Sequence, residues 1–90
     1  MLLQKEIITS ARKSEVKKII KALEKGEIEK AKQMLETYYD LVEDSWNEAS
    51  GERKDRLEER MMLVEEAISE LEDGNIKECL EVLEEILHET

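Results

Sequence analysis

A short turn occurs twice in the chain, as Leu23-Glu24-Lys25-Gly26-Glu27-Ile28 and, 48 residues later, as Leu71-Glu72-Asp73-Gly74-Asn75-Ile76. In each copy the glycine follows one apolar series at helical spacing and precedes a second. A glycine at this place is the usual left-handed C-terminal cap of a helix. The two copies therefore predict an all-α fold, in which two repeated antiparallel helical hairpins form one four-helix domain over residues 1–90.

The repeat extends well beyond the turns, because residues 12–42 align with residues 60–90 at the same offset of 48. Most of the identical positions are apolar or glycine, as the packing of two helices requires. The identical pairs are Arg12/Arg60, Val16/Val64, Ile20/Ile68, Leu23/Leu71, Glu24/Glu72, Gly26/Gly74, Ile28/Ile76, Leu35/Leu83 and Glu36/Glu84. The pattern predicts approximate internal two-fold symmetry. It leaves two packings open, a four-helix bundle and a short two-repeat solenoid.

Apolar periodicity sets the expected bounds of the helices and their buried faces. The hairpins are expected over about residues 2–44 and 52–89, with helices over about 2–25, 28–44, 52–73 and 75–88. The residues expected in the core are Leu3, Ile7, Ala11, Val16, Ile19, Ile20, Leu23, Ile28, Ala31, Leu35, Tyr38, Val42, Leu57, Met61, Val64, Ala67, Ile68, Leu71, Ile76, Cys79, Leu80, Leu83, Ile86 and Leu87.

Two serines are candidates for the start of the third helix. Ser45 with Glu48 has the pattern of a capping box, whereas Ser50 followed by Gly51 has the pattern of a chain break and a new N-cap. We favour Ser50, because the apolar seam of the second helix lapses before it.

The first turn continues into Glu29-Lys30-Ala31-Lys32-Gln33-Met34-Leu35-Glu36, so that glycine and an acid precede an aliphatic residue, an alanine and a bulky apolar residue. This stretch resembles the centre of a tetratricopeptide-type hairpin, and residues 73–83 resemble it more loosely. The chain departs from that family in its period of 48 and in the missing tryptophan, leucine-glycine and terminal proline positions. The resemblance implies the local hairpin geometry and a protein-binding scaffold, and it assigns no ligand-binding residue.

The composition predicts a thin core. The apolar residues are mainly aliphatic, with no Phe, two Tyr and one Trp, and a chain of 90 residues buries only about 60 to 65% of its unfolded surface. Such chains often gain stability by self-association, and we expect a homodimer. The apolar runs are too short for a signal peptide or a membrane span. A single cysteine needs no oxidising compartment, so we expect a cytoplasmic protein.

Charge is divided unevenly along this acidic chain, whose formal net charge is -10. Residues 1–32 hold nine bases and five acids, whereas residues 33–90 hold five bases and nineteen acids. The lysines of the first helix predict a basic stripe, made of Lys13, Lys17, Lys18, Lys21 and Lys25. Acids stand at equivalent places of the second copy, where Lys17, Lys18, Lys25 and Lys30 align with Glu65, Glu66, Asp73 and Glu78. We therefore expect the stripe near the acidic hairpin of the same or a partner chain. The net charge and the lack of interleaved aromatics argue against nucleic acid.

Two patterns are candidates for chemistry. Glu85 and His88 match the Glu-x-x-His element of di-iron bundle proteins, because residues three apart share a helical face. That face lies opposite the apolar residues of the fourth helix, so we expect it to meet water and to hold no metal. Cys79 takes the place of Ala31 and has no basic neighbour to lower its pKa, so we expect a small core residue. We expect no catalytic residue and no cofactor.

Aromatic residues widen the apolar surface of the second helix. Met34, Tyr39, Val42 and Trp46 extend it beyond a narrow seam. These residues either belong to the ordinary core or form a protein interface, for which Tyr39, Val42 and Trp46 are the candidates. The sequence therefore favours a non-enzymatic helical module for protein–protein interaction that associates with itself. The alternative is a small all-α metal- or nucleotide-dependent enzyme with its site at a dimer interface.

Overall fold

The computed structural model describes residues 14–88, and 89% of the described chain is helical. It contains four helices and no strand within that range, so the predicted all-α, four-helix fold is confirmed. The first helix is described over residues 14–24, and it is followed by α2 (Ile28–Glu48), α3 (Gly51–Glu72) and α4 (Ile76–His88). The expectations for Leu3, Ile7, Ala11 and Lys13 lie outside the described residues.

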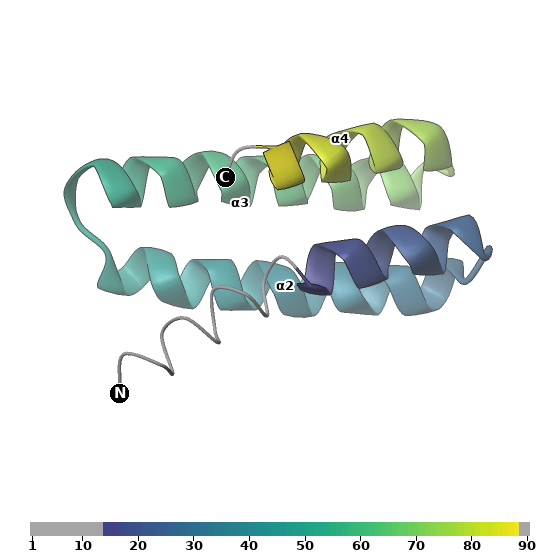
Figure 1. Cartoon of the computed structure of the whole chain (residues 1–90), viewed down its shortest axis with the longest axis horizontal. Coiled ribbons are helices and arrows are strands. Elements are labelled where there is room, and N and C mark those ends of the chain that lie inside the picture. The colour runs from purple at the N-terminus through teal and green to yellow at the C-terminus, as the bar shows by residue number, and fades with distance from the viewer. Residues whose placement is uncertain (1–13, 89–90) are drawn as a thin grey trace.

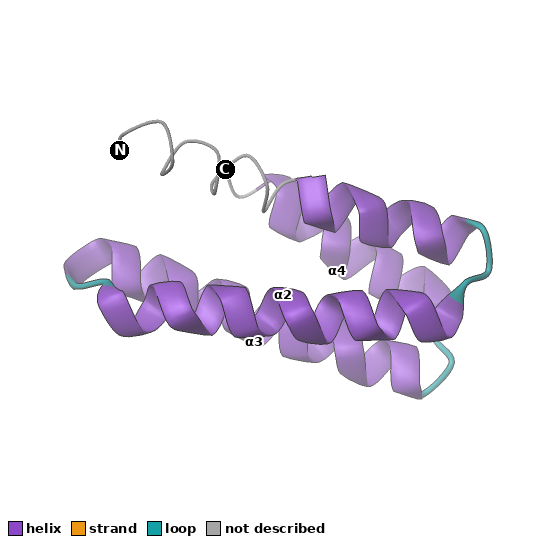
Figure 2. Ribbon diagram, turned by 90° about the horizontal axis from the view of Figure 1, so that it is seen from below, coloured by secondary structure: helices purple, strands orange, loops and turns teal. Residues whose placement is uncertain are grey.

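The helices form two layers that face each other. Figure 1 shows the first helix beside α2 in one layer and α3 beside α4 in the other. Figure 2 shows that α2 runs along α3, and these two helices are longer than α4, with 21 and 22 residues against 13. Both hairpins contribute to one common core, which is the packing of a bundle. None of the helices in residues 14–88 is long and apolar enough to cross a membrane.

The two glycine turns have the same geometry. Gly26 and Gly74 each have a φ of 81°, in the left-handed region that glycine adopts without strain. The Gly26 amide donates to the Leu23 carbonyl at 3.0 Å, and the next amide donates to the Ala22 carbonyl at 2.9 Å. The second turn repeats both hydrogen bonds, at 3.1 and 2.8 Å. This pair of bonds is the Schellman motif, which satisfies the last carbonyls of a helix.

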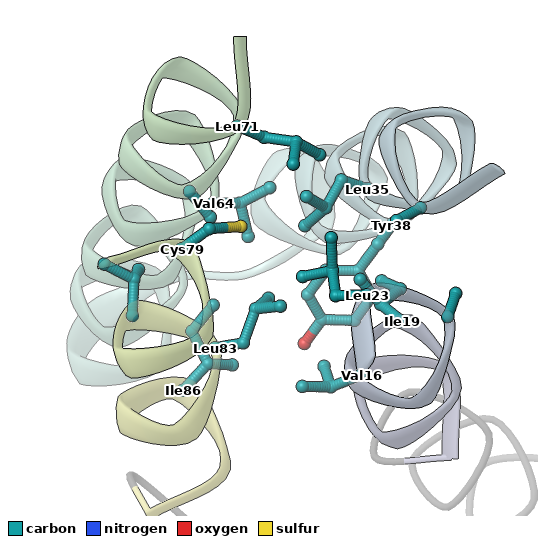
Figure 3. Close-up of a cluster of buried hydrophobic side chains, with 14 of the residues drawn as sticks. Val16, Ile19, Leu23, Leu35, Tyr38, Val64, Leu71, Cys79, Leu83 and Ile86 are labelled. Carbon is teal, nitrogen blue, oxygen red and sulfur yellow. The ribbon is translucent and has the colours of Figure 1, made fainter. Parts of the chain in front are cut away.

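The core agrees closely with the predicted apolar stripes. Figure 3 shows Ile19 and Leu23 of the first helix directed toward Leu83 and Ile86 of α4 across the centre of the bundle. The buried apolar residues are Val16, Ile19, Ala22, Leu23, Ala31, Leu35, Tyr38, Val42, Leu57, Val64, Ala67, Leu71, Cys79, Val82, Leu83 and Ile86. The other residues expected there within the described chain pack against this cluster half-buried, namely Ile20, Ile28, Met61, Ile68, Ile76, Leu80 and Leu87.

The connection between the hairpins is shorter than the sequence predicts, because α2 continues to Glu48 instead of ending near residue 44. Ser45 is buried inside α2, one turn beyond Val42 on the same face, so the small hydroxyl side chain continues the seam. The alternative prediction, in which the third helix begins at Ser45, is therefore wrong. Ser50 has extended backbone, with φ -145° and ψ 162°, and it is the N-cap of α3 as predicted.

Alanine at either glycine turn is expected to destabilise the protein by about 1 kcal/mol, because an L side chain is strained at this positive φ. A Cβ at Gly26 or Gly74 would meet no atom within 4 Å, so the strain comes from the backbone alone. Urea unfolding of Gly26→Ala and Gly74→Ala measures the loss. Gly26→Asn is the matched control and should lose less, because asparagine tolerates the left-handed region. An alanine variant more stable than the parent would contradict the positive φ.

Candidate interaction surfaces

Three polar contacts, at steps of seven residues along α2, join this helix to α3. They are the ion pair between Lys32 Nζ and Glu72 Oε2 at 3.3 Å, the hydrogen bond that Tyr39 Oη donates to Glu65 Oε1 at 2.8 Å, and the ammonium of Lys54 at 4.4 Å from the centre of the Trp46 ring. Residues seven apart lie on the same side of a helix. One flank of α2 is therefore joined to α3 along most of its length.

The predicted interface of Tyr39, Val42 and Trp46 is largely used inside the chain. Val42 is 0% exposed, so its assignment to a surface is wrong. It lies in step with Leu35 and Tyr38, and that series faces the core. Tyr39 and Trp46 are half-buried at the edge of α3, and within the described chain the buried Trp46 Nε1 has no hydrogen-bond partner. The Trp46 ring therefore contributes through packing and through the cation of Lys54.

The environment of Tyr39 keeps its phenol protonated. The hydrogen bond to Glu65 is the main cause of a raised Tyr39 pKa, and burial together with the charges of Glu65, Glu43 and Asp40 acts in the same direction. A neutral phenol is the form that donates to a carboxylate. The raised pKa therefore leaves the Tyr39 phenol protonated and able to donate at neutral pH.

Cys79 is a core residue. Its side chain is 0% exposed, and Figure 3 shows the sulfur directed toward the centre of the bundle. Burial, and secondarily the charge of Glu70, raises the pKa of the Cys79 thiol to about 11. The thiolate is the nucleophilic form, and it is scarce at neutral pH with such a pKa. Cys79 is therefore placed to pack as a small apolar group.

An open acidic groove lies on the outer side of the second hairpin, between α3 and α4. Val82 forms part of its floor, and the side chains along it are mostly glutamates: Glu66, Glu70, Glu78, Glu81, Glu84 and Glu85, with His88 at one end. A second hollow adjoins it and shares Glu66 and Glu85, with Glu59, Met62 and Leu63 as its other lining residues. Met62 is 65% exposed, so the groove combines apolar surface with a dense negative charge.

Glu85 and His88, the predicted candidates for a metal, both lie exposed along this groove. Within residues 14–88 the structure brings together no group of three or more His, Cys, Asp and Glu side chains in a position to hold a metal ion. The motif therefore stays a pair of exposed side chains in the described part of the chain.

The basic stripe faces water on the first helix. Lys17, Lys18, Lys21 and Lys25 are exposed, on the side of the helix opposite Val16, Ile19 and Leu23. Because those three apolar residues point to the second hairpin, the lysines point away from it. Lys18 pairs with Glu15 of its own helix at 3.9 Å.

No family model, no curated protein and no solved structure matches this chain in the three comparisons. The functional argument therefore rests on the residues and surfaces described above.

Loss of the Tyr39 hydroxyl is expected to destabilise the protein by about 0.5 to 1 kcal/mol, because Glu65 loses its donor on a partly exposed flank. Thermal or urea unfolding of Tyr39→Phe measures this loss. Glu65→Gln is the matched control, since it keeps an oxygen that accepts the hydrogen bond, and it should lose less. A Tyr39→Phe variant as stable as the parent would show that the contact contributes nothing in solution.

Stability is expected to fall in alkaline solution as Cys79 ionises. Its pKa rises on folding from 9.0 to about 11, so the folded chain holds the thiol proton more tightly than the unfolded chain. This contribution is fully present below pH 9 and is lost as pH rises through about 11, and it is at most about 2 to 3 kcal/mol. Unfolding free energies from about pH 8 to pH 10.5 should decline more steeply in the parent than in Cys79→Ala.

Tyr39→Phe is the control for that series, because Tyr39 also has a raised pKa. Tyr39→Phe should retain the decline in unfolding free energy that begins near pH 9, because that decline comes from the Cys79 thiol. Equal pH dependence in the parent and Cys79→Ala would contradict the raised pKa of Cys79.

Proposed function

We propose that this protein is a non-enzymatic helical module for protein–protein interaction, and that it associates with itself. The observation that carries this proposal is the separation of charge on the outer surface. Glutamates line the groove of α3 and α4, while lysines cover the outer side of the first helix. Charged faces of this kind give protein association its specificity and steer the encounter of partners.

Exposed apolar side chains support the same proposal. Met62 is 65% exposed beside the acidic groove, and Leu41 is 41% exposed on α2, so among residues 14–88 each hairpin places a large apolar side chain on its surface. An apolar contact inside a charged rim is the common anatomy of a protein interface. The thin aliphatic core adds a reason for association, because small domains often gain stability from a partner.

A homodimer in the cytoplasm is the simplest form of this proposal. Closed dimers are the commonest oligomers of soluble proteins. The single Cys79 is buried and free, so the fold makes no use of an oxidising compartment.

Sedimentation of the purified chain tests the proposal. We expect a mass above the monomer value of 10.5 kDa at micromolar concentrations. Leu41→Ser and Met62→Ser should each shift the protein toward monomer, because they remove exposed apolar contacts, whereas Asn47→Ser on the surface of α2 should leave the mass unchanged. A strict monomer would refute self-association. A stoichiometric metal in the purified protein would instead favour the small helical enzyme.

A further inference from the structure

The two hairpins carry opposite charge at some equivalent positions of their outer faces, such as Lys18/Glu66 and Lys30/Glu78. Four of the glutamates that line the acidic groove are Glu66 on α3 and Glu78, Glu81 and Glu85 on α4. The offset of 48 residues relates them to Lys18, Lys30, Gln33 and Thr37 of the first hairpin. At these four positions the first hairpin is therefore basic or neutral, whereas the groove residue Glu84 has an identical acidic counterpart in Glu36.

These two faces do not meet within one chain. The lysines of the first helix lie opposite its buried side. The acidic groove belongs to α3 and α4, which form the other layer (Figure 1). Among the described residues, Lys32–Glu72 is the only ion pair that joins the two hairpins, and neither residue belongs to these faces. The opposite charges of the two faces are therefore left available to different molecules.

The spacing of the two faces is also compatible. Lys17, Lys21 and Lys25 follow one another at one-turn steps along the first helix, and Glu81 and Glu85 do so along α4. Each hairpin also exposes an apolar side chain, Leu41 of α2 in one and Met62 near the middle of α3 in the other. A second copy laid over the groove can therefore offer one lysine per helical turn.

We propose that the acidic groove of α3 and α4 docks the lysine-bearing outer face of the first helix of a second copy of this chain. The inference rests on the self-association proposed above and names its surfaces, and it replaces the closed homodimer with an assembly of copies joined through two different faces. The contact is heterologous, because it joins two different faces. Since these faces lie on opposite layers, a docked copy keeps one face free and the assembly continues beyond a dimer, into a ring or an open chain.

The net charge of -10 on each copy opposes this contact at long range. Salt limits that repulsion to about 8 Å at physiological ionic strength, whereas charges in direct contact are screened less. The match between the two faces therefore decides whether copies associate. The association is weak and reversible, because exposed ion pairs contribute little each.

Charge reversal on one face at a time tests the docking. The double variant Lys17→Glu with Lys21→Glu makes both faces acidic, and Glu66→Lys with Glu81→Lys makes the groove basic. All four residues are exposed, so both variants should keep the parent helix content by circular dichroism. Each variant alone should sediment as a monomer, because like charges then face each other. An equimolar mixture should associate about tenfold more strongly than either variant alone.

Matched controls separate the faces from the total charge. Arg53→Glu with Arg56→Glu, and Glu29→Lys with Glu36→Lys, change the net charge by the same amounts at exposed positions outside both faces. These variants should retain the association of the parent, and mixing them should add nothing. A loss as large as that of the face variants would show that net charge alone governs the association and would overturn the docking.

Three further results overturn the proposal and identify what failed. A monomeric mixture of the two face variants shows that the faces do not bind each other. If each face variant alone associates as strongly as the parent, another surface mediates self-association. The proposed function then stands without this docking. A monomeric parent refutes both proposals. In that case, binding of a synthetic lysine-rich amphipathic peptide would assign the groove to a different protein.

Discussion

Burial of one aliphatic seam between the two hairpins is the constraint on which the rest of the structure depends. The seam contains a single buried aromatic ring, that of Tyr38, and is otherwise built from Leu, Ile, Val, Ala and Cys side chains. Each large side chain that leaves water contributes about 1.5 to 3 kcal/mol, against the entropy of ordering the chain. No single anchor dominates, so the helices must be held at the right places along the chain. The two left-handed glycines do this by reversing the chain at fixed residues.

The sequence was sufficient for the fold because the core and the turns leave local patterns. Apolar residues at helical spacing placed Leu35 and Leu83 in the core, and the structure buries both completely. Ala22 and Val82 were missed, although both are buried. Apolar residues spaced alternately three and four apart mark only a narrow seam, whereas a helix in a four-helix bundle buries a broader face. Ala22 and Val82 lie in that broader face. The continuation of α2 to Glu48 was also not predicted, because Ser45 is polar and yet occupies a buried position of the seam.

The surfaces were less predictable, because they depend on the register between helices. Tyr39 and Trp46 were correctly seen as part of a wider face of α2, but their partners Glu65 and Lys54 lie on another helix. Periodicity says which residues share a face of one helix, and it does not say which residue of the next helix lies opposite. The same limit applies to the acidic groove. Its glutamates are plain in the sequence, yet only the packing of α3 on α4 brings them to one groove.

A comparison of the two hairpins separates the residues that determine the fold from those that the fold leaves free to vary. Identical residues such as Val16 and Val64 lie inside, where both copies must fill the same kind of space. Positions with opposite charge, such as Lys18 and Glu66, lie outside, where the fold imposes no requirement. Lys32 and Glu72 show how little charge is needed for the fold, since they are 34% and 54% exposed and such pairs contribute at most about 1 kcal/mol. Because the apolar seam already fixes how the hairpins pack, the outer charges can differ between the hairpins without changing the fold.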